Sequence, residues 1–367
     1  MILSELLPSE MPELEAFFRS LSLPMPAENL AQFCLPRVSG TRLKVVTLVM
    51  RDEGRIVGTV GWIDVALRVN DQRGLPLSGQ NETLRWPVNL YLLPESRGKG
   101  LGKQLMEATR QGAALRAVIG GNAASMPVLD RTGWQVIGHL SSVRWRRPCL
   151  DPSRLRERLG PIDRRPPPER VTVRTAHHAI TARRVERALG WLPWAAVESP
   201  GAPFEAGPPR DAHDIEFAFG HALRRYHTLH EVTVNGVVAG FFALAARAER
   251  SPWLTTEVMD LDAVPGRETQ VIRAARATAL SCADVARFRF GGARFARALA
   301  SMGMGGRFTV DHPLRVSFDP ARAIDGPHLR QVDSWRLTYG DHDQYRVRSS
   351  SIPWVTSQAV PPSGVAR

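Results

Sequence analysis

The sequence has few cysteines and no long apolar run. The three cysteines in 367 residues are far apart and lack the spacing of metal ligands: Cys34, Cys149 and Cys282. No apolar stretch approaches the roughly 20 residues that a membrane-spanning helix needs, and the first residues, Met1–Glu5, lack the basic region of a secretory signal. These absences predict a reduced, cytoplasmic protein with no membrane segment and no bound metal.

Lysine is also scarce. Lys44, Lys99 and Lys103 are the three lysines among 48 basic residues, and the formal net charge is +12. A basic chain can attract nucleic acid, but here the arginines are spread along the whole length and no nucleic-acid-binding motif accompanies them. We therefore expect no nucleic-acid partner, because an anionic small ligand or an acidic surface would account for the same charge.

Two of the three lysines lie in one stretch, Trp86–Met106. An apolar run ends at Pro94, a loop follows with glycine at every second position, and apolar residues at helical spacing begin at Leu101. Glycines let the backbone approach a ligand closely, and the free N–H groups and dipole of a helix start favour an anion. With Lys99 and Lys103 beside it, this strand–loop–helix predicts a binding site for a diphosphate.

The loop sequence resembles that of a known family. Arg97–Gly102 reads Arg-Gly-Lys-Gly-Leu-Gly and matches the Arg/Gln-x-x-Gly-x-Gly/Ala signature of the GNAT acyl-CoA-dependent N-acyltransferases. In that family the loop holds the coenzyme A pyrophosphate, and the preceding strand separates from its neighbour so that its backbone pairs with the pantetheine arm. The resemblance implies acetyl-CoA, or another acyl-CoA, as co-substrate. It assigns cofactor contacts to Leu92, Leu93, Arg97, Gly98, Lys99, Gly100, Leu101, Gly102, Lys103, Asn122 and Ser125.

A second GNAT signature is matched in part. In the family an asparagine starts the next helix and a Gly-aromatic pair ends it, and Asn122 and Gly133-Trp134 keep that spacing. The family often places a tyrosine seven residues after the asparagine to protonate the leaving thiolate, but this position is Leu129. The position of the family's glutamate base, aligned on the glycine loop, is Trp86.

The identity of the catalytic acid and base is therefore undecided, and three candidates remain: Tyr91, Asn89 and Glu82. Tyr91 is the first candidate for an acid or proton relay, since alternate residues of its strand share a face that can meet the thioester. A packed aromatic ring is the competing interpretation for Tyr91, and a solvated loop carboxylate is the competing one for Glu82.

The second half of the chain repeats the first in outline. Gly240 after an Asn-Gly turn matches Gly58, and Gly291-Gly292 matches Gly120-Gly121. The repeat breaks down at the loop, because Asp262–Glu268 has one glycine instead of three. Asp260, Asp262 and Glu268 also stand where a diphosphate would lie and would repel it.

The expected fold is therefore α/β, of the GNAT type, with two tandem mixed-sheet domains and helices on both faces. The expected divisions are an acetyltransferase domain with the acyl-CoA site at 1–150, a Pro/Arg-rich linker at 151–169, a degenerate GNAT-like domain at 170–348 and a flexible tail at 349–367.

Several elements follow from periodicity and turn residues. We predict helices at 8–21, 27–33, 179–189, 216–226 and 268–283, a hairpin at 43–67, an inserted loop at 68–83, and closing strands for the first half at 136–145. Asp341-His342-Asp343 could suggest a metal site, but three consecutive residues cannot all face one ion without a special loop, and a surface turn is the preferred interpretation.

The favoured function is transfer of an acyl group from acetyl-CoA to a primary amine of a small molecule, such as an amino sugar or an amino acid derivative. A non-catalytic acyl-CoA-binding or scaffold protein is the alternative, and a protein lysine acetyltransferase is a third. The sequence leaves homo-oligomer formation open.

Overall fold

The computed structural model describes most of the chain. The described residues are 1–21, 44–70, 82–113, 115–121, 124–146, 166–186, 205–207, 215, 219, 226–247, 254–305, 308–319, 327–338 and 351–352. Several predictions concern residues outside these ranges: the helix at 27–33, most of the linker and of the helix at 216–226, Asn122, and Asp341–Asp343.

In the first half, antiparallel strands are followed by one parallel strand. The strands are β1 (Ile2–Glu5), β2 (Lys44–Asp52), β3 (Arg55–Asn70), β4 (Glu82–Leu92) and β5 (Leu115–Ile119), with β5 parallel to β4. The hairpin from β2 to β3 is confirmed. Its turn residues Glu53 and Gly54 have φ angles of 48° and 82°, the left-handed pair that a two-residue turn requires.

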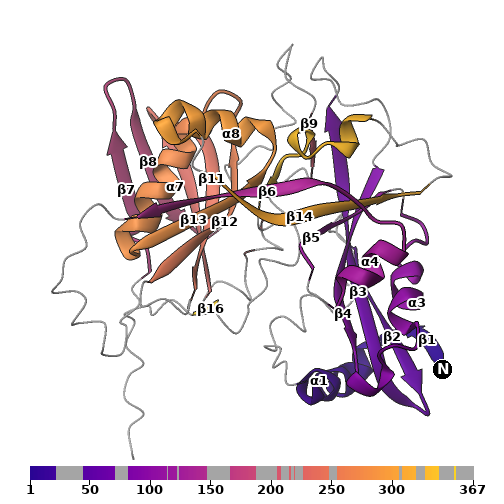
Figure 1. The fold of residues 1–367 in the computed structure, drawn as a ribbon. Coiled ribbons are helices and arrows are strands. Elements are labelled where there is room, and N and C mark those ends of the chain that lie inside the picture. Colours follow the sequence, from indigo (N-terminus) through magenta and orange to yellow (C-terminus); the bar gives the residue numbers. More distant parts are fainter. Residues whose placement is uncertain are drawn as a thin grey trace, which may run out of the picture.

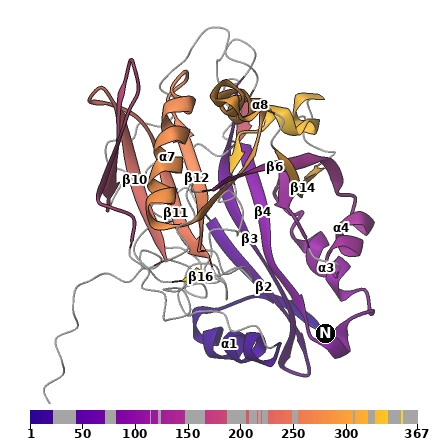
Figure 2. The ribbon, with the colours of Figure 1, turned by 60° about the vertical axis from the view of Figure 1, so that its left-hand side comes forward.

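Helices lie on both sides of this sheet. Figure 2 shows α1 (Met11–Ser20) on one side of β2–β4, and α3 (Leu101–Ala108) and α4 (Met126–Arg131) on the other. The helix predicted at 8–21 is therefore confirmed, after a short 3-10 turn at Pro8–Glu10. Its buried residues, Leu14, Phe17 and Phe18, have the spacing of one helix face.

The second half has the same plan. Strands β7 (Arg170–Arg174), β8 (Ala179–Val185), β10 (His227–Val234), β11 (Val237–Arg247), β12 (Thr255–Ala263) and β13 (Val285–Gly291) accompany helices α7 (Glu268–Cys282) and α8 (Ala293–Leu299). The turn from β10 to β11 is the predicted Asn235-Gly236 pair, with φ angles of 51° and 85°. The prediction of a helix at 268–283 is confirmed.

The helix predicted at 179–189 is wrong. Residues Ala179–Val185 form β8, which pairs with both β7 and β10. Ile180 and Ala182 are buried and the residues between and beside them are not, which is the period of two of a strand. The short apolar segment satisfies either pattern, and the neighbouring strands determine the outcome.

Two strands join the halves. β6 (Gln135–Arg146) belongs to the first half and β14 (Thr309–Phe318) to the second, and they pair antiparallel. β14 also pairs with β5, and β6 also pairs with β13. The sheet is thereby continuous, in the order β1-β2-β3-β4-β5-β14-β6-β13-β12-β11-β10-β8-β7. Figure 1 shows β6 and β14 crossing side by side between the halves.

This exchange corrects the expectation that residues 136–145 close the first half alone. These residues form one strand, and the strand beside β5 comes from beyond residue 300. The largest hydrophobic core is shared as well, since it contains Trp86 and Leu115 together with Leu314, Phe241 and Trp335. The α/β fold of two tandem mixed-sheet units is confirmed, and the numerical domain boundaries stay predictions.

Two smaller segments depart from the sequence prediction. β3 extends to Asn70, and β4 begins at Glu82, so the predicted loop at 68–83 starts and ends in strand; β9 (Glu205–Gly207) pairs with Arg68–Asn70. In the predicted tail, Ser351–Ile352 forms β16, which pairs with the end of β11.

Candidate functional site

The connection from β4 to α3 has the geometry of an anion cradle. After a 3-10 turn at Pro94–Ser96, Gly98 and Gly100 have φ angles of 78° and 79°, and no heavy atom lies within 4 Å of where a Cβ would stand on either. Gly100 is the N-cap of α3. Two exposed glycines in the left-handed conformation before a helix start leave backbone N–H groups open to an anion.

The third glycine of the motif serves packing. A Cβ on Gly102 would lie 3.3 Å from Val128 Cγ2 of α4 and 3.5 Å from Leu92 Cδ1 of β4. Glycine at this position therefore lets α3 lie close to its neighbours. Leu101 is buried beneath the same turn, and it fixes the end of the helix at the loop.

Basic side chains surround this turn. Arg97 and Lys99 are exposed, and Lys103, in the first turn of α3, lies 3.6 Å from Glu107 with both side chains more than 40% exposed. An exposed ion pair of this kind is worth little energy in water, so Lys103 can turn to an anion at little cost.

Beside the loop, β4 and β5 separate. The two strands pair at Leu84–Leu115 and at Arg85–Arg116, while β4 continues to Leu92 and β5 to Ile119. The separation predicted from the family resemblance is therefore present. Parallel strands that diverge leave backbone groups on their facing edges without strand partners, and an extended ligand can add to such an edge.

An irregularity in β4 lies at the opening. The pairing of β4 with β3 shifts between Val88–Gly61 and Tyr91–Thr59, and the buried Asn89 has a φ of 56°. This is a β-bulge, which bends a strand and redirects its backbone groups. A non-glycine residue in this conformation is strained, and such strain occurs often beside functional sites.

The three predicted catalytic residues have different surroundings in the structure. Asn89 lies in the bulge, and Tyr91 is partly buried with its ring 5.4 Å from that of Phe18 in α1. The Glu82 side chain lies outside the described residues. Ser125 is the N-cap of α4, and its Oγ would lie 3.3 Å from a Cβ on Gly121, at the end of β5.

Two positions where the family places acid and base are packed in the core. Trp86 is 1% exposed and Leu129 is 3% exposed. Neither side chain has a group that can accept or release a proton as an acid or base near neutral pH. Any proton transfer at this site must use other groups.

The structure brings one group to the site that local sequence patterns did not indicate. His312 of β14 lies beside Gly120, where β5 ends: a Cβ on Gly120 would be 3.4 Å from His312 Nδ1. The two residues are far apart in sequence, and β14 comes from the second half. Only the strand exchange brings them together.

The second half lacks the loop. In the first half the Leu93 N–H donates to Val57 O, and in the second the Val264 N–H donates to Ala239 O, which fixes the structural equivalence. From these residues to the next helix the first half has residues 94–100, seven in all, and the second has 265–267, three in all. The shorter connection has no room for the two-glycine turn.

The opening between β12 and β13 is filled by the chain itself. β12 and β13 pair from Thr255–Val285 to Val258–Phe288. Beyond that point β13 pairs with β15 (Leu337–Thr338). The segment comes so close to β13 that a Cβ on Gly292 would lie 2.1 Å from Trp335 O. The backbone of residues 335–338 thus takes the place that an extended ligand would occupy in the first half.

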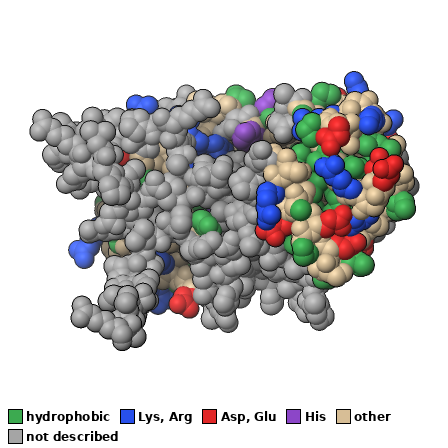
Figure 3. Space-filling view, turned by 90° about the horizontal axis from the view of Figure 1, so that it is seen from below, with side chains coloured by type: hydrophobic (Ala, Val, Ile, Leu, Met, Phe, Trp, Pro, Cys, Tyr) green, Lys and Arg blue, Asp and Glu red, His purple; other side chains and the backbone are tan. Residues whose placement is uncertain are grey.

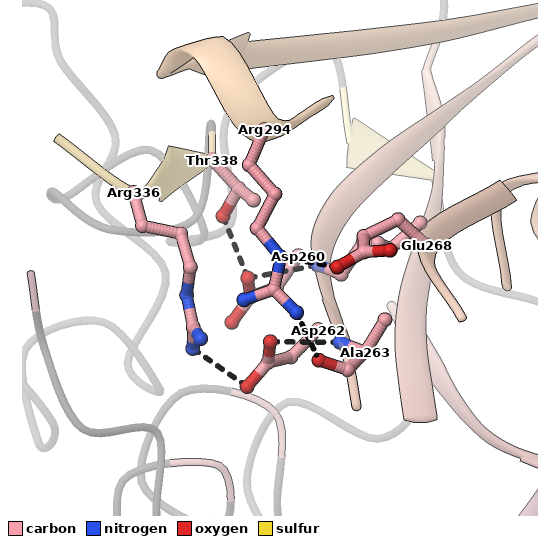
Figure 4. A network of polar contacts seen from close by, with 8 residues as sticks. Asp260, Asp262, Ala263, Glu268, Arg294, Arg336 and Thr338 are labelled. Carbon is pink, nitrogen blue, oxygen red and sulfur yellow. Dashed lines mark hydrogen bonds and ion pairs between the residues drawn. The ribbon is translucent and has the colours of Figure 1, made fainter. Parts of the chain in front are cut away.

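Side chains hold this segment in place (Figure 4). Arg336 Nη2 donates to Asp262 Oδ2 at 2.6 Å, and Thr338 Oγ1 donates to Asp260 Oδ1 at 2.6 Å. At the start of α7, Glu268 accepts hydrogen bonds from the backbone N–H of Gly266 and from Arg294. The acidic residues that predicted repulsion of a diphosphate are therefore used to bind the chain's own groups.

The described surface shows no segregation of charge in the view of Figure 3, where acidic and basic side chains intermingle. Arg51, for example, lies 2.6 Å from Glu13 and 2.9 Å from Glu10. In the described ranges, no three His, Cys, Asp or Glu side chains gather as metal ligands would, and no helix there is long and apolar enough to span a membrane.

Comparison with known proteins agrees with this geometry. Residues 44–131 match the family model described as "Acetyltransferase (GNAT) domain". This range holds β2 to β5, the glycine loop, α3 and α4. No curated protein sequence matches the chain.

Solved structures are similar in fold at low sequence identity. A GCN5-related N-acetyltransferase from Anabaena variabilis ATCC 29413 is 9% identical, with a TM-score of 0.52 over 86% of this chain and 72% of that one. A probable N-acyltransferase of unknown function from Enterococcus faecalis V583 is 12% identical over the same shares, with a TM-score of 0.49. A tandem GNAT protein from the clavulanic acid biosynthesis pathway is 11% identical over 88% of this chain and 99% of that one, with a TM-score of 0.49.

Proposed function

Because this chain is a tandem protein of the GNAT superfamily, we propose that it is an N-acyltransferase that uses acetyl-CoA and acts on a primary amine of a small molecule, such as an amino sugar or an amino acid derivative. One observation carries the proposal: the strand opening between β4 and β5 leads to the two-glycine turn at Gly98 and Gly100. An extended arm and a diphosphate together match this combination.

The chain's own groups divide the work of binding. The backbone N–H groups at Gly100 and in the first turn of α3 would bind the diphosphate, and Arg97, Lys99 and Lys103 would add positive charge. The backbone of β4 that faces the opening would pair with the pantetheine arm. At the bulge around Asn89, where the pairing of β4 with β3 shifts, a backbone N–H of β4 would orient the thioester carbonyl.

One alternative is favoured by a specific observation. Trp86 and Leu129 are packed in the core, so the chain lacks the carboxylate and the phenol of the best-known relatives. A protein that binds acyl-CoA without turnover would have these features. We place the acyltransferase first because a proton can also leave through water or another side chain.

The test is a thiol-release assay of the full chain with acetyl-CoA and a panel of amino sugars, amino acid derivatives and lysine peptides. Turnover of a small amine supports the proposal, while turnover confined to peptides supports the protein acetyltransferase. Calorimetric binding of acetyl-CoA without turnover of any amine supports the non-catalytic binder. Absence of binding overturns the acyl-CoA assignment.

A further inference from the structure

The strand that the second half supplies to the first is irregular where it reaches the site. β14 pairs with β6 at Val310–Ser141 and next at Pro313–His139. Two residues of β14, Asp311 and His312, therefore stand opposite one residue of β6, Leu140. This arrangement is a β-bulge. Bulges of this kind redirect side chains and are frequent next to active sites.

Three features fix His312 at the end of β5. The Gly120 N–H donates to Pro313 O at 2.8 Å, which locks the two strands at this point. Gly120 has a φ of 83°, and its missing Cβ leaves room for the half-buried imidazole of His312, whose Nδ1 would lie 3.4 Å from that atom. Pro313 also restricts His312 to an extended backbone.

This location is level with the bulge of β4 across the opening. The last paired residues of β4 and β5 are Arg85 and Arg116. Asn89 and Gly120 each follow four residues later (89 − 85 and 120 − 116). At about 3.3 Å per residue, both stand about 13 Å from the point where the strands separate. Asn89 and Gly120 thus lie at the same level on the two sides of the opening, and His312 stands beside Gly120 on the next strand of the sheet.

We propose that His312 is the proton acceptor of the acyl transfer, a role that rests on the proposed function. A neutral amine nitrogen attacks the thioester carbonyl carbon, the new C–N bond forms, and the C–S bond breaks. The proton lost by the nitrogen passes to an imidazole nitrogen of His312, and the imidazolium then returns that proton, directly or through water, to the coenzyme A thiolate, which leaves as the thiol. An imidazole has an ordinary pKa of about 6.5, and it can therefore accept a proton near neutral pH.

This role would give the second half a part in the reaction. The first half has core residues at the two positions where its relatives hold acid and base, as Trp86 and Leu129 show. The group that replaces them comes from a strand of the other half. The degenerate half then completes the site of the competent one.

The internal repeat supplies a matched control. Leu314 pairs with Ile119, and Ser141 pairs with Phe290. Two residues before Leu314 is His312, and two residues before Ser141 is His139. His139 is thus the equivalent histidine, on β6, and it is exposed. The backbone of His139 pairs with that of Pro313, next to His312, so a change of its exposed side chain tests the loss of a histidine beside β14 while His312 itself is kept.

The experiment compares His312→Gln, His312→Ala and His139→Gln in the full chain. Acetyl-CoA affinity is measured by calorimetry, and turnover is measured with the amine that wild type acetylates fastest. We expect kcat of both His312 variants to fall at least about 100-fold, with acetyl-CoA affinity within about threefold of wild type. Added imidazole should restore part of the activity of His312→Ala, and His139→Gln should keep wild-type kcat.

The outcomes separate this proposal from the proposed function. If wild type acetylates an amine and His312→Gln keeps kcat within threefold, the role of His312 is refuted while the acyltransferase stands. If the variants lose acetyl-CoA affinity together with kcat and imidazole restores nothing, His312 has only a structural role. If wild type acetylates no amine, both proposals fall.

Discussion

Arg336 and Asp262 form an ion pair in the interior of the second half, with 2.6 Å between Nη2 and Oδ2 and both side chains 1% exposed. Arg336 lies in the segment that fills the opening between β12 and β13, and Asp262 lies in β12, at one edge of that opening. The pair therefore holds the chain's own backbone in the opening between β12 and β13. In the second half, this opening is therefore filled by the protein itself.

Removing one partner of this pair should destabilise the protein strongly. Arg336→Met leaves the Asp262 carboxylate buried without its counter-charge, and the expected loss is about 3–5 kcal/mol of the free energy of unfolding. Asp262→Asn should lose a similar amount, since it leaves the guanidinium uncompensated. Urea unfolding measures both. The double variant should lose clearly less than the sum of the two single losses, because neither charge of the pair is then left without its partner, and an additive loss would contradict the argument.

The filled opening also predicts the number of acetyl-CoA sites. Calorimetry on the full chain should give one site per chain. The control is a pair of glycines at equivalent turns, Gly100 and Gly266, with φ angles of 79° and 81° and open space around both. Gly100→Asp should remove binding, and Gly266→Asp should leave the affinity unchanged. Two sites per chain, or loss of affinity in Gly266→Asp, would show that the second half binds the ligand.

The sequence was informative where structure is local. The loop at Arg97–Gly102, the turn at Asn235-Gly236 and the helix at Glu268–Cys282 depend on nearby residues, and the structure contains all three. Turn chemistry and helix periodicity act over a few residues. The broken repeat at Asp262–Glu268 was visible for the same reason.

Features set by distant parts of the chain could not be predicted. Residues 179–185 satisfy a helix and a strand equally, and the pairing with β7 and β10 selects the strand. The insertion of β14 beside β5 joins residues about two hundred positions apart, and the filling of the β12–β13 opening by residues 335–338 depends on the same long-range contacts. Periodicity carries no information about strand order. For this reason the sequence analysis did not predict His312 as a site residue. The internal repeat, in which His312 and His139 are equivalent positions, is a signal that could have indicated it.

Anion binding by the glycine loop can be tested with a control glycine that has a similar positive φ angle. Gly100→Asp combined with Lys99→Ala puts a carboxylate beside an anionic diphosphate and removes a positive charge. Acetyl-CoA affinity should fall at least about 100-fold, or roughly 2.7 kcal/mol. Gly112 has a φ of 74° with nothing within 4 Å of its Cβ position, and Gly112→Asp therefore introduces comparable backbone strain outside the loop. It should bind acetyl-CoA like wild type. Equal affinity in all three proteins by calorimetry would refute the cradle.

His230 should make the stability of the second half depend on pH. Its imidazole is fully buried, lies 3.0 Å from Thr228 Oγ1 through Nε2, and stacks on Phe242 at 4.8 Å. Burial, with a contribution from the charge of Arg184, lowers the pKa of His230 from 6.5 to about 3.

The sign follows from which state binds the proton. Between pH 6.5 and 3 the unfolded chain protonates this histidine and the folded chain does not, so acid favours unfolding there. At pH 5 the group should cost about 2 kcal/mol of stability relative to neutral pH, at about 1.4 kcal/mol per pH unit. Urea unfolding at pH 7.5 and pH 5 measures this. His230→Phe should lose less stability than wild type on the same change of pH, and His139→Gln, at an exposed histidine, should respond like wild type. Equal responses in wild type and His230→Phe would show that His230 does not remain neutral in the folded protein.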